Sequence, residues 1–103
     1  MMDKSDVSQP ISVILNGTNY RHWYEAMRNF LKGRKLWRYT TGDITGPTKA
    51  TNEADQKFAE RLEDWDSKNH QIITWLRNTS IPSIHLQFGQ FETAKAIWDH
   101  LAQ

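Results

Sequence analysis

The chain has 103 residues, 38% hydrophobic and 24% charged, with a formal net charge of +1, and a chain of this length forms one domain that buries about 65% of its unfolded surface. It contains no cysteine, which excludes disulfide bonds, a thiol nucleophile and cysteine-ligated zinc. No apolar run reaches the roughly 18 to 20 residues of a membrane helix and no signal peptide begins the chain, so we expect a cytoplasmic protein without a membrane partner.

The first ten residues are polar and end in a proline. Such a segment cannot offset the entropy of ordering, and we expect a disordered tail at residues 1–10 followed by a helical domain at residues 11–103. Apolar side chains then alternate at Ile11, Val13 and Leu15. This alternation predicts a short extended segment that packs on the first helix.

The most regular pattern in the chain predicts a helix over residues 19–32. Its apolar residues follow the 3.6-residue period and are Tyr20, Trp23, Tyr24, Met27, Phe30 and Leu31. The short polar side chain of Asn19 is suited to the start of this helix. Gly33 is predicted to end it, because glycine takes the left-handed conformation without steric cost. One or two further helical turns are expected over residues 36–39, before a loop at residues 40–52.

A second long helix is predicted from Asn52 to about Asn78. Its apolar row has spacings of three and four residues, with one polar member, and consists of Phe58, Leu62, Trp65, Asn69, Ile72 and Leu76. Trp75 lies off this row. We therefore interpret Trp75 as the best candidate among the tryptophans for exposure or for contact with another molecule.

The last third of the chain predicts two more helices. Pro82 begins a short one that Gly89 interrupts, and a final helix opens at Thr93 and continues its apolar stripe to Leu101. That unfinished stripe leads us to expect the front part of a longer protein. The fold class is thus all-α, a compact bundle of about five helices. Its expected core anchors are Tyr20, Trp23, Met27, Phe30, Trp37, Leu62, Trp65 and Trp98.

No pattern of reactive side chains indicates catalysis. The four histidines lack metal-ligand spacing, and Asp64 and Asp66 fit a solvated acidic face better than a catalytic pair. Neither a phosphate-binding loop nor a strand-to-helix nucleophile turn is present in the sequence. We expect no enzyme, no catalytic or metal residues, no cofactor and no small-molecule substrate.

Charge is distributed unevenly along the chain. Residues 20–40 carry six basic residues and one acidic residue, whereas residues 41–66 carry seven acidic and three basic residues. Four cations fall on one face of the first helix, namely Arg21, Arg28, Lys32 and Lys35. A solvated helix face explains them, and so does a surface for assembly or for RNA. Complementary charge can also join one molecule to the next.

Several short motifs resemble the N-terminal part of Gag polyproteins from copia-type LTR retrotransposons of plants. They are residues 15–20 (LNGTNY), the apolar positions Trp23, Met27 and Leu31, then Leu36, Trp37 and Gly42, and finally residues 94–101 (AKAIWDHL). The first and last motifs are specific in combination, and the match spans most of the chain.

This resemblance implies a helical, capsid-like structural domain that self-assembles into virus-like particles around the element's RNA. In this family further helices follow, commonly with a Cys-Cys-His-Cys zinc knuckle that binds RNA, and this sequence contains neither. Self-association is therefore the expected role, with RNA as a weak and non-specific partner of this fragment. The alternative is a repurposed Gag-derived module that binds a host protein or RNA without forming particles.

Overall fold

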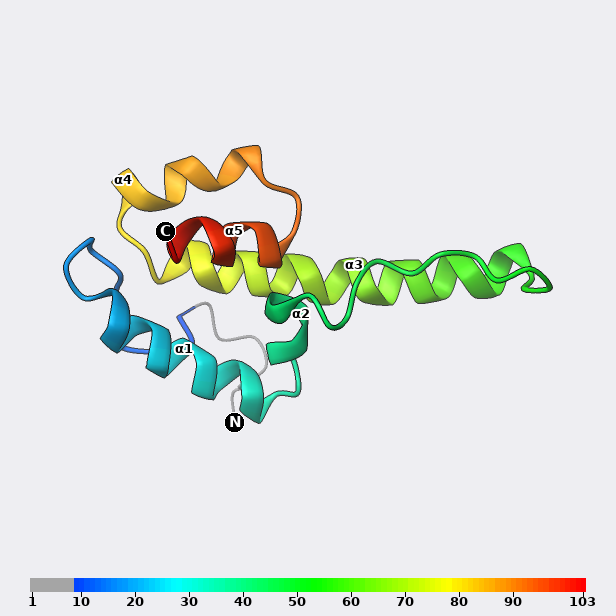
Figure 1. Cartoon of the computed structure of the whole chain (residues 1–103), viewed down its shortest axis with the longest axis horizontal. Coiled ribbons are helices and arrows are strands. Elements are labelled where there is room, and N and C mark those ends of the chain that lie inside the picture. Colours follow the sequence, from blue (N-terminus) through cyan, green and yellow to red (C-terminus); the bar gives the residue numbers. More distant parts are fainter. Residues whose placement is uncertain (1–8) are drawn as a thin grey trace.

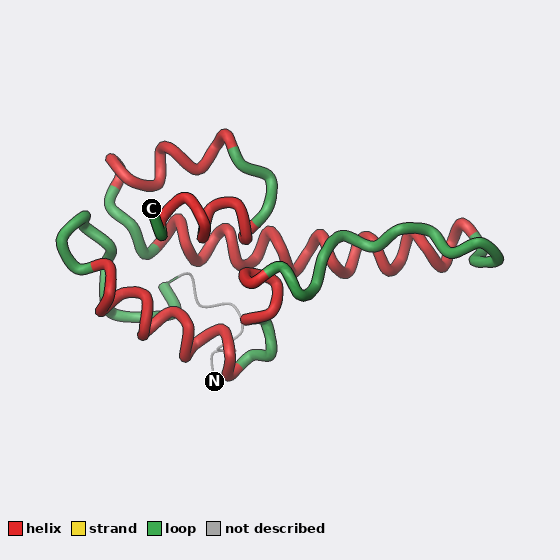
Figure 2. Tube along the Cα trace, viewed as in Figure 1, coloured by secondary structure: helices red, strands yellow, loops and turns green. Residues whose placement is uncertain are grey.

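The computed structural model describes residues 9–103, so the tail predicted at residues 1–10 lies outside the described residues except for its last two positions. The described part is helical, which confirms the predicted all-α class (Figures 1 and 2). Its elements are α1 (Tyr20–Gly33), α2 (Trp37–Thr41), α3 (Asp55–Asn78), α4 (Pro82–His85), the 3₁₀ helix η2 (Leu86–Gln90) and α5 (Ala94–Leu101).

Helix α3 is the longest element and organises the others (Figure 1). Its C-terminal half packs with α1, α2 and α5, while its N-terminal half extends beyond the bundle with the α2–α3 loop running beside it. We name residues 43–66, which comprise this loop and the first half of α3, the arm. The molecule consequently measures 49 × 38 × 20 Å, more elongated than the compact bundle expected from the sequence.

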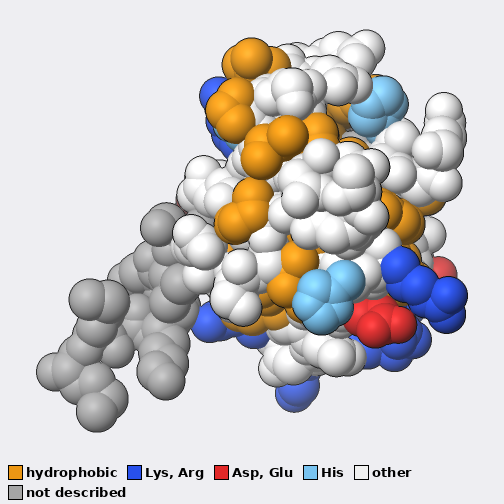
Figure 3. Space-filling model, turned by 90° about the vertical axis from the view of Figure 1, so that its left-hand side faces the viewer, with side chains coloured by type: hydrophobic (Ala, Val, Ile, Leu, Met, Phe, Trp, Pro, Cys, Tyr) orange, Lys and Arg blue, Asp and Glu red, His pale blue; other side chains and the backbone are white. Residues whose placement is uncertain are grey.

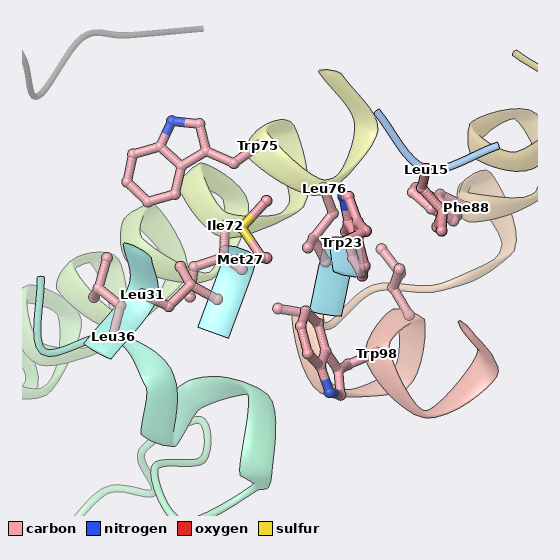
Figure 4. Close-up of a cluster of buried hydrophobic side chains, with 12 residues drawn as sticks. Leu15, Trp23, Met27, Leu31, Leu36, Ile72, Trp75, Leu76, Phe88 and Trp98 are labelled. Carbon is pink, nitrogen blue, oxygen red and sulfur yellow. The ribbon is translucent and has the colours of Figure 1, made fainter. Parts of the chain in front are cut away.

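The core lies where α1 crosses the C-terminal half of α3 (Figure 4). Trp23 and Met27 from α1 are fully buried against Ile72 and Leu76 from α3, and Trp98 of α5 closes one side. The indole Nε1 of Trp23 donates to the hydroxyl of Thr79 at 3.1 Å, and that hydroxyl donates to the carbonyl of Trp75 at 2.9 Å. The large buried tryptophan is thus also satisfied as a hydrogen-bond donor.

The predicted extended segment makes a contact that its pattern did not indicate. Leu15 forms an isolated parallel bridge with Ser80, the second residue after the end of α3. Its N–H donates to the Thr79 carbonyl at 2.7 Å, and its own carbonyl accepts from the Ile81 N–H at 3.0 Å. The segment before α1 is therefore held to the turn between α3 and α4.

The ends of α1 differ from those predicted. Asn19 precedes the helix but forms no capping bond; its side chain instead accepts from the Asn16 N–H at 3.0 Å and donates to the Ile14 carbonyl at 2.8 Å. Gly33 is the last residue of α1, and the left-handed residue is Lys35, with φ of 63°. A lysine in this conformation is uncommon, and it redirects the chain into α2.

The polar member of the α3 row, Asn69, joins that helix to the start of α5. Asn69 is buried. Its Nδ2 donates to the Glu92 carbonyl at 2.9 Å, and its Oδ1 accepts from the Ala94 N–H at 2.8 Å. One buried amide thus satisfies two backbone groups at the entry to α5, where the Thr93 hydroxyl also accepts from the Ala96 N–H at 3.1 Å.

The expected exposure of Trp75 is wrong. Trp75 is only 3% exposed, and the ring of Phe30 meets it edge-on at 4.8 Å between centroids. The guanidinium of Arg34 lies 4.7 Å from the Phe30 ring and 5.4 Å from the Trp75 ring. Because α1 covers a wider sector of α3 than one apolar row, a residue beside the row is buried as well.

The expected burial of Leu62 is also wrong, since its side chain is 40% exposed. Leu62 lies on the arm, where α3 has passed beyond the bundle. Trp65, one turn further along α3, is half-buried beside the loop, within reach of Gly46. Among the other expected anchors, Trp23, Met27 and Trp98 are buried, while Tyr20, Phe30 and Trp37 are half-buried against the core.

Candidate assembly surfaces

A group of cations surrounds a groove at the junction of α1, α2 and the arm. The groove has a volume of ≈ 460 Å³ and is lined by Lys32, Lys35, Trp37, Arg38 and Ile44. We name this set of residues the basic corner. Two of its members come from α2, one from the end of α1, one from the turn between these helices and one from the loop. Its sides are cationic, and Trp37 and Ile44 supply its apolar surface.

The cations of the basic corner differ in how they are paired. Lys32 and Lys35 are exposed, and within the described residues neither takes part in an ion pair. Arg38 Nε lies 3.8 Å from Asp43 Oδ2, a loose and exposed pair. Such a pair contributes only up to about 1 kcal/mol. All three cations therefore remain accessible to an external anion.

Trp37 is held in place by other aromatic rings. Its ring meets Trp98 edge-on at 5.2 Å and Tyr24 edge-on at 6.1 Å. The guanidinium of Arg28 lies 5.6 Å from the Trp37 centroid, within the range of a cation–π contact. The apolar part of the basic corner is thus connected to the core through Trp98 and does not depend on a mobile side chain.

The predicted cationic face of α1 divides into two parts in the structure. Lys32 and Lys35 line the groove, and Arg28 stacks on the tryptophan that borders it. Arg21 lies near the other end of α1, with a side chain that is 93% exposed and 3.9 Å from Glu25. Sequence spacing did not identify Arg38 as a member, because Arg38 belongs to a different helix.

Within the arm, the loop covers one side of α3. Arg61 on α3 donates from Nε and Nη2 to the Glu53 carboxylate at 2.7 and 2.8 Å, and from Nη2 to the Thr48 carbonyl at 3.0 Å. The Ala50 N–H also donates to Glu53 at 3.0 Å, and Lys49 pairs with Asp55. The hydrogen bonds from Arg61 and then from Ala50 lower the pKa of Glu53 to about 2. The loop is thereby fixed along the helix.

Between this loop and the helix lies a hollow of ≈ 560 Å³. Its apolar floor is formed by Tyr39, Ile44, Pro47 and Trp65, and its helix side carries the charged residues Lys57, Glu60, Arg61 and Asp64. The Nε1 of Trp65 is buried and has no hydrogen-bond partner. Among the described residues no group of three histidine, aspartate or glutamate side chains could hold a metal ion.

The opposite side of the arm is open. Its residues, Ala59, Leu62, Glu63 and Asp66, border a shallow depression and follow the spacing of one helix face. We name this set the open face. Leu62 is its exposed apolar member, and Glu63 forms no ion pair within the described part of the chain. Asp66 Oδ1 lies 3.3 Å from His70 Nδ1.

The end of the molecule opposite the arm has a different character (Figure 3). Hydrophobic side chains emerge there in a broken band, with few acidic side chains among them. A hollow of ≈ 300 Å³ at this end includes Tyr20, Ile84, His100 and Leu101 in its lining. The residues that line this hollow include no lysine, arginine, aspartate or glutamate, so it offers less electrostatic selectivity than the basic corner or the open face.

Comparison with known proteins gives a family match over part of the chain. Residues 5–48 match the family model described as the Gag-polypeptide of LTR copia-type. This match confirms the resemblance to copia-type Gag, and it includes α1, α2 and the whole basic corner. No curated protein and no solved structure matches the chain. Among the helices of residues 9–103, none is both long and apolar enough to cross a membrane.

Proposed function

From the match to copia-type Gag, we propose that this chain is a structural capsid-like domain that associates with copies of itself, as the shell-forming part of a particle that packages the element's RNA. The observation that carries the proposal is the presence of two accessible surfaces of opposite charge, the basic corner and the open face of the arm. A shell subunit needs two different surfaces that meet in neighbouring copies.

The shape of the molecule supports this role. The arm extends from the bundle, so the open face can reach a neighbouring molecule without steric hindrance from the rest of its own chain (Figure 1). Contacts in a shell can be individually weak, because many of them act together in a closed particle. Weak association of the single chain is therefore consistent with an assembly unit.

A second candidate function is a repurposed module that binds RNA or a host protein without building particles. The observation that favours it is the basic corner itself, where Lys32, Lys35 and Arg38 surround the half-buried ring of Trp37. Cations beside an aromatic ring suit single-stranded nucleic acid. This reading leaves the open face of the arm without a role.

Sedimentation velocity over a range of concentrations tests the proposed function. We expect the weight-average sedimentation coefficient to rise between micromolar and about 1 mM chain, the range in which contacts of about −4 kcal/mol become half-saturated. Electron microscopy of the concentrated sample should then reveal assemblies larger than a dimer. A chain that stays monomeric throughout, while binding single-stranded RNA, would favour the repurposed module.

A further inference from the structure

We propose that the open face of the arm of one copy docks into the basic corner of the next copy, so that the chains associate head to tail. This inference rests on the proposed function, because it names the two surfaces through which self-association occurs. It is carried by the match in both charge and apolar content between two surfaces that lie apart in one molecule.

The open face presents one apolar side chain between acidic ones. Leu62 is 40% exposed, and Glu63 and Asp66 lie one and four residues further along α3, on the same side of the helix. An exposed leucine on a monomer is not unusual by itself. Here it lies on an extended helix whose opposite side is already covered by the loop.

The basic corner offers the complementary arrangement. Trp37 and Ile44 form the apolar part of the ≈ 460 Å³ groove, and Lys32, Lys35 and Arg38 supply three cations around it. A leucine side chain fits a groove of this volume, and the two carboxylates beside it would meet unpaired lysines. Because aromatic contacts fix Trp37, little ordering entropy is lost when the groove is filled.

The two surfaces cannot meet within one molecule. In an α-helix successive residues are rotated by about 100° around the axis. The open face therefore lies on the side of α3 opposite to Glu60, Arg61 and Asp64, the residues that border the loop-covered hollow. The open face thus points away from its own loop, including the loop residue Ile44 that lines the groove. The occupant of each groove must be the arm of a second copy.

A contact between two different surfaces has a structural consequence. It is heterologous, so each added copy leaves one free arm and one free groove, and the assembly grows until it closes as a ring or continues as a filament. A two-fold symmetric contact would instead stop at a dimer. Growth beyond the dimer is therefore part of the inference.

Charge exchange tests the pairing. One variant, Lys32→Glu/Lys35→Glu, reverses the groove, and a second, Glu63→Lys/Asp66→Lys, reverses the open face. In sedimentation velocity we expect each to weaken association by at least about tenfold. A chain that carries all four substitutions should regain most of the association, because its charges are complementary again. Arg21→Glu and Glu60→Lys are matched controls outside the two surfaces, and circular dichroism verifies that every variant is helical.

The outcomes separate this inference from the proposed function. If the unaltered chain does not associate at any concentration, the proposed function and the inference both fall. The inference alone is overturned if the groove and open-face variants associate like the unaltered chain, or if the chain with all four substitutions does not regain association. It is also overturned if the unaltered chain stops at a dimer. Loss of association in both two-residue variants, with recovery in the chain that carries all four substitutions, supports the inference.

Discussion

At the scale of single residues, two tryptophans hold α1 against α3 in different ways. Trp23 is fully buried and donates to Thr79, whereas Trp75 is buried under Phe30 and Arg34. Both therefore contribute large apolar areas to one interface. The loss of either ring should open a cavity in the same part of the core.

We expect Trp75→Ala to lower the free energy of unfolding by about 3 to 5 kcal/mol, as much as Trp23→Ala, because each leaves a cavity the size of an indole ring. Urea denaturation followed by circular dichroism measures both. Leu86→Ala is the control, since Leu86 is 70% exposed and its change should stay within about 0.5 kcal/mol. A Trp75→Ala effect as small as that of the control would contradict the burial described here.

Asn69 provides a second test at this scale. Asn69→Leu removes both hydrogen bonds to the entry of α5 and leaves the Glu92 carbonyl and the Ala94 N–H without their partner. An unsatisfied buried group costs about 1 to 3 kcal/mol, so thermal unfolding should shift downward by several degrees. Asn69→Asp retains an acceptor for Ala94, but at neutral pH its carboxylate would be a buried charge beside the Glu92 carbonyl, so it should lose at least as much as Asn69→Leu. A loss in Asn69→Asp much smaller than that in Asn69→Leu would argue against the role of the Glu92 bond.

The sequence predicted the position of Asn69 but not the burial of Trp75, and the difference has a physical reason. The spacing of α3 identified Asn69 as the polar member of an apolar row, but its two backbone partners lie more than twenty residues away and carry no local signal. Trp75 was misplaced because periodicity assumes one narrow contact line, whereas α1 covers a broader sector of α3. Local spacing indicates which residues are apolar, but it does not tell how wide the contact is.

At the scale of elements, helix positions were predictable and the arm was not. The apolar period of α1 and the proline that begins α4 determine those helices locally. The row of Phe58, Leu62 and Trp65 has the same period, and it predicted burial. Within residues 9–103 no other helix packs along that half of α3, and one side of it is covered by the loop, with Tyr39 of α2 at the base. An amphipathic pattern shows that a helix can be buried, and burial also requires a partner.

The attachment of the loop to α3 should depend on pH. The hydrogen bonds from Arg61 and Ala50 lower the pKa of Glu53 from 4.5 to about 2. When the pH is above the pKa of the released carboxyl group, about 4.5, the ionised Glu53 stabilises the fixed loop. This contribution is lost as the pH falls from about 4.5 towards 2. Hydrogen exchange of the loop amides, measured by NMR and expressed relative to the intrinsic exchange rate, should therefore become faster in that pH window. The core amides should respond only at lower pH.

Glu53→Gln is the matched variant for this test. It keeps the size of the side chain but removes the charge that Arg61 binds. Its loop amides should exchange rapidly already at neutral pH and should show no further acceleration between pH 4.5 and 2. An unaltered chain whose loop amides exchange at one rate, relative to the intrinsic rate, throughout that window would contradict the role given to Glu53.

At the scale of the whole molecule, the candidate site is a product of tertiary structure. The sequence indicated the cations of α1 and the reversal of charge after them. It did not place Arg38 and Ile44 beside Lys32, because the left-handed turn at Lys35 brings α2 back towards α1. The sequence also did not show that Arg21 lies far from Lys32, because residues aligned on one helix face can still lie at opposite ends of the helix axis. The open face could not be predicted, because the sequence pattern assigned Leu62 to the core and the structure leaves it exposed.

RNA supplies the last prediction at this scale. If single-stranded RNA binds this chain, the basic corner is the site, and Lys32, Lys35 and Arg38 set the number of phosphates neutralised. Three phosphate contacts give a log–log salt slope of about −2 with single strands. Fluorescence anisotropy of a labelled oligonucleotide measures this slope. Lys32→Ser/Lys35→Ser should reduce it to about −0.7, whereas Arg21→Ser should leave it unchanged.

Because RNA and the arm of a neighbouring copy would share the two lysines, the oligonucleotide should also weaken self-association at low salt. Base-specific binding that persists at high salt would be incompatible with this surface.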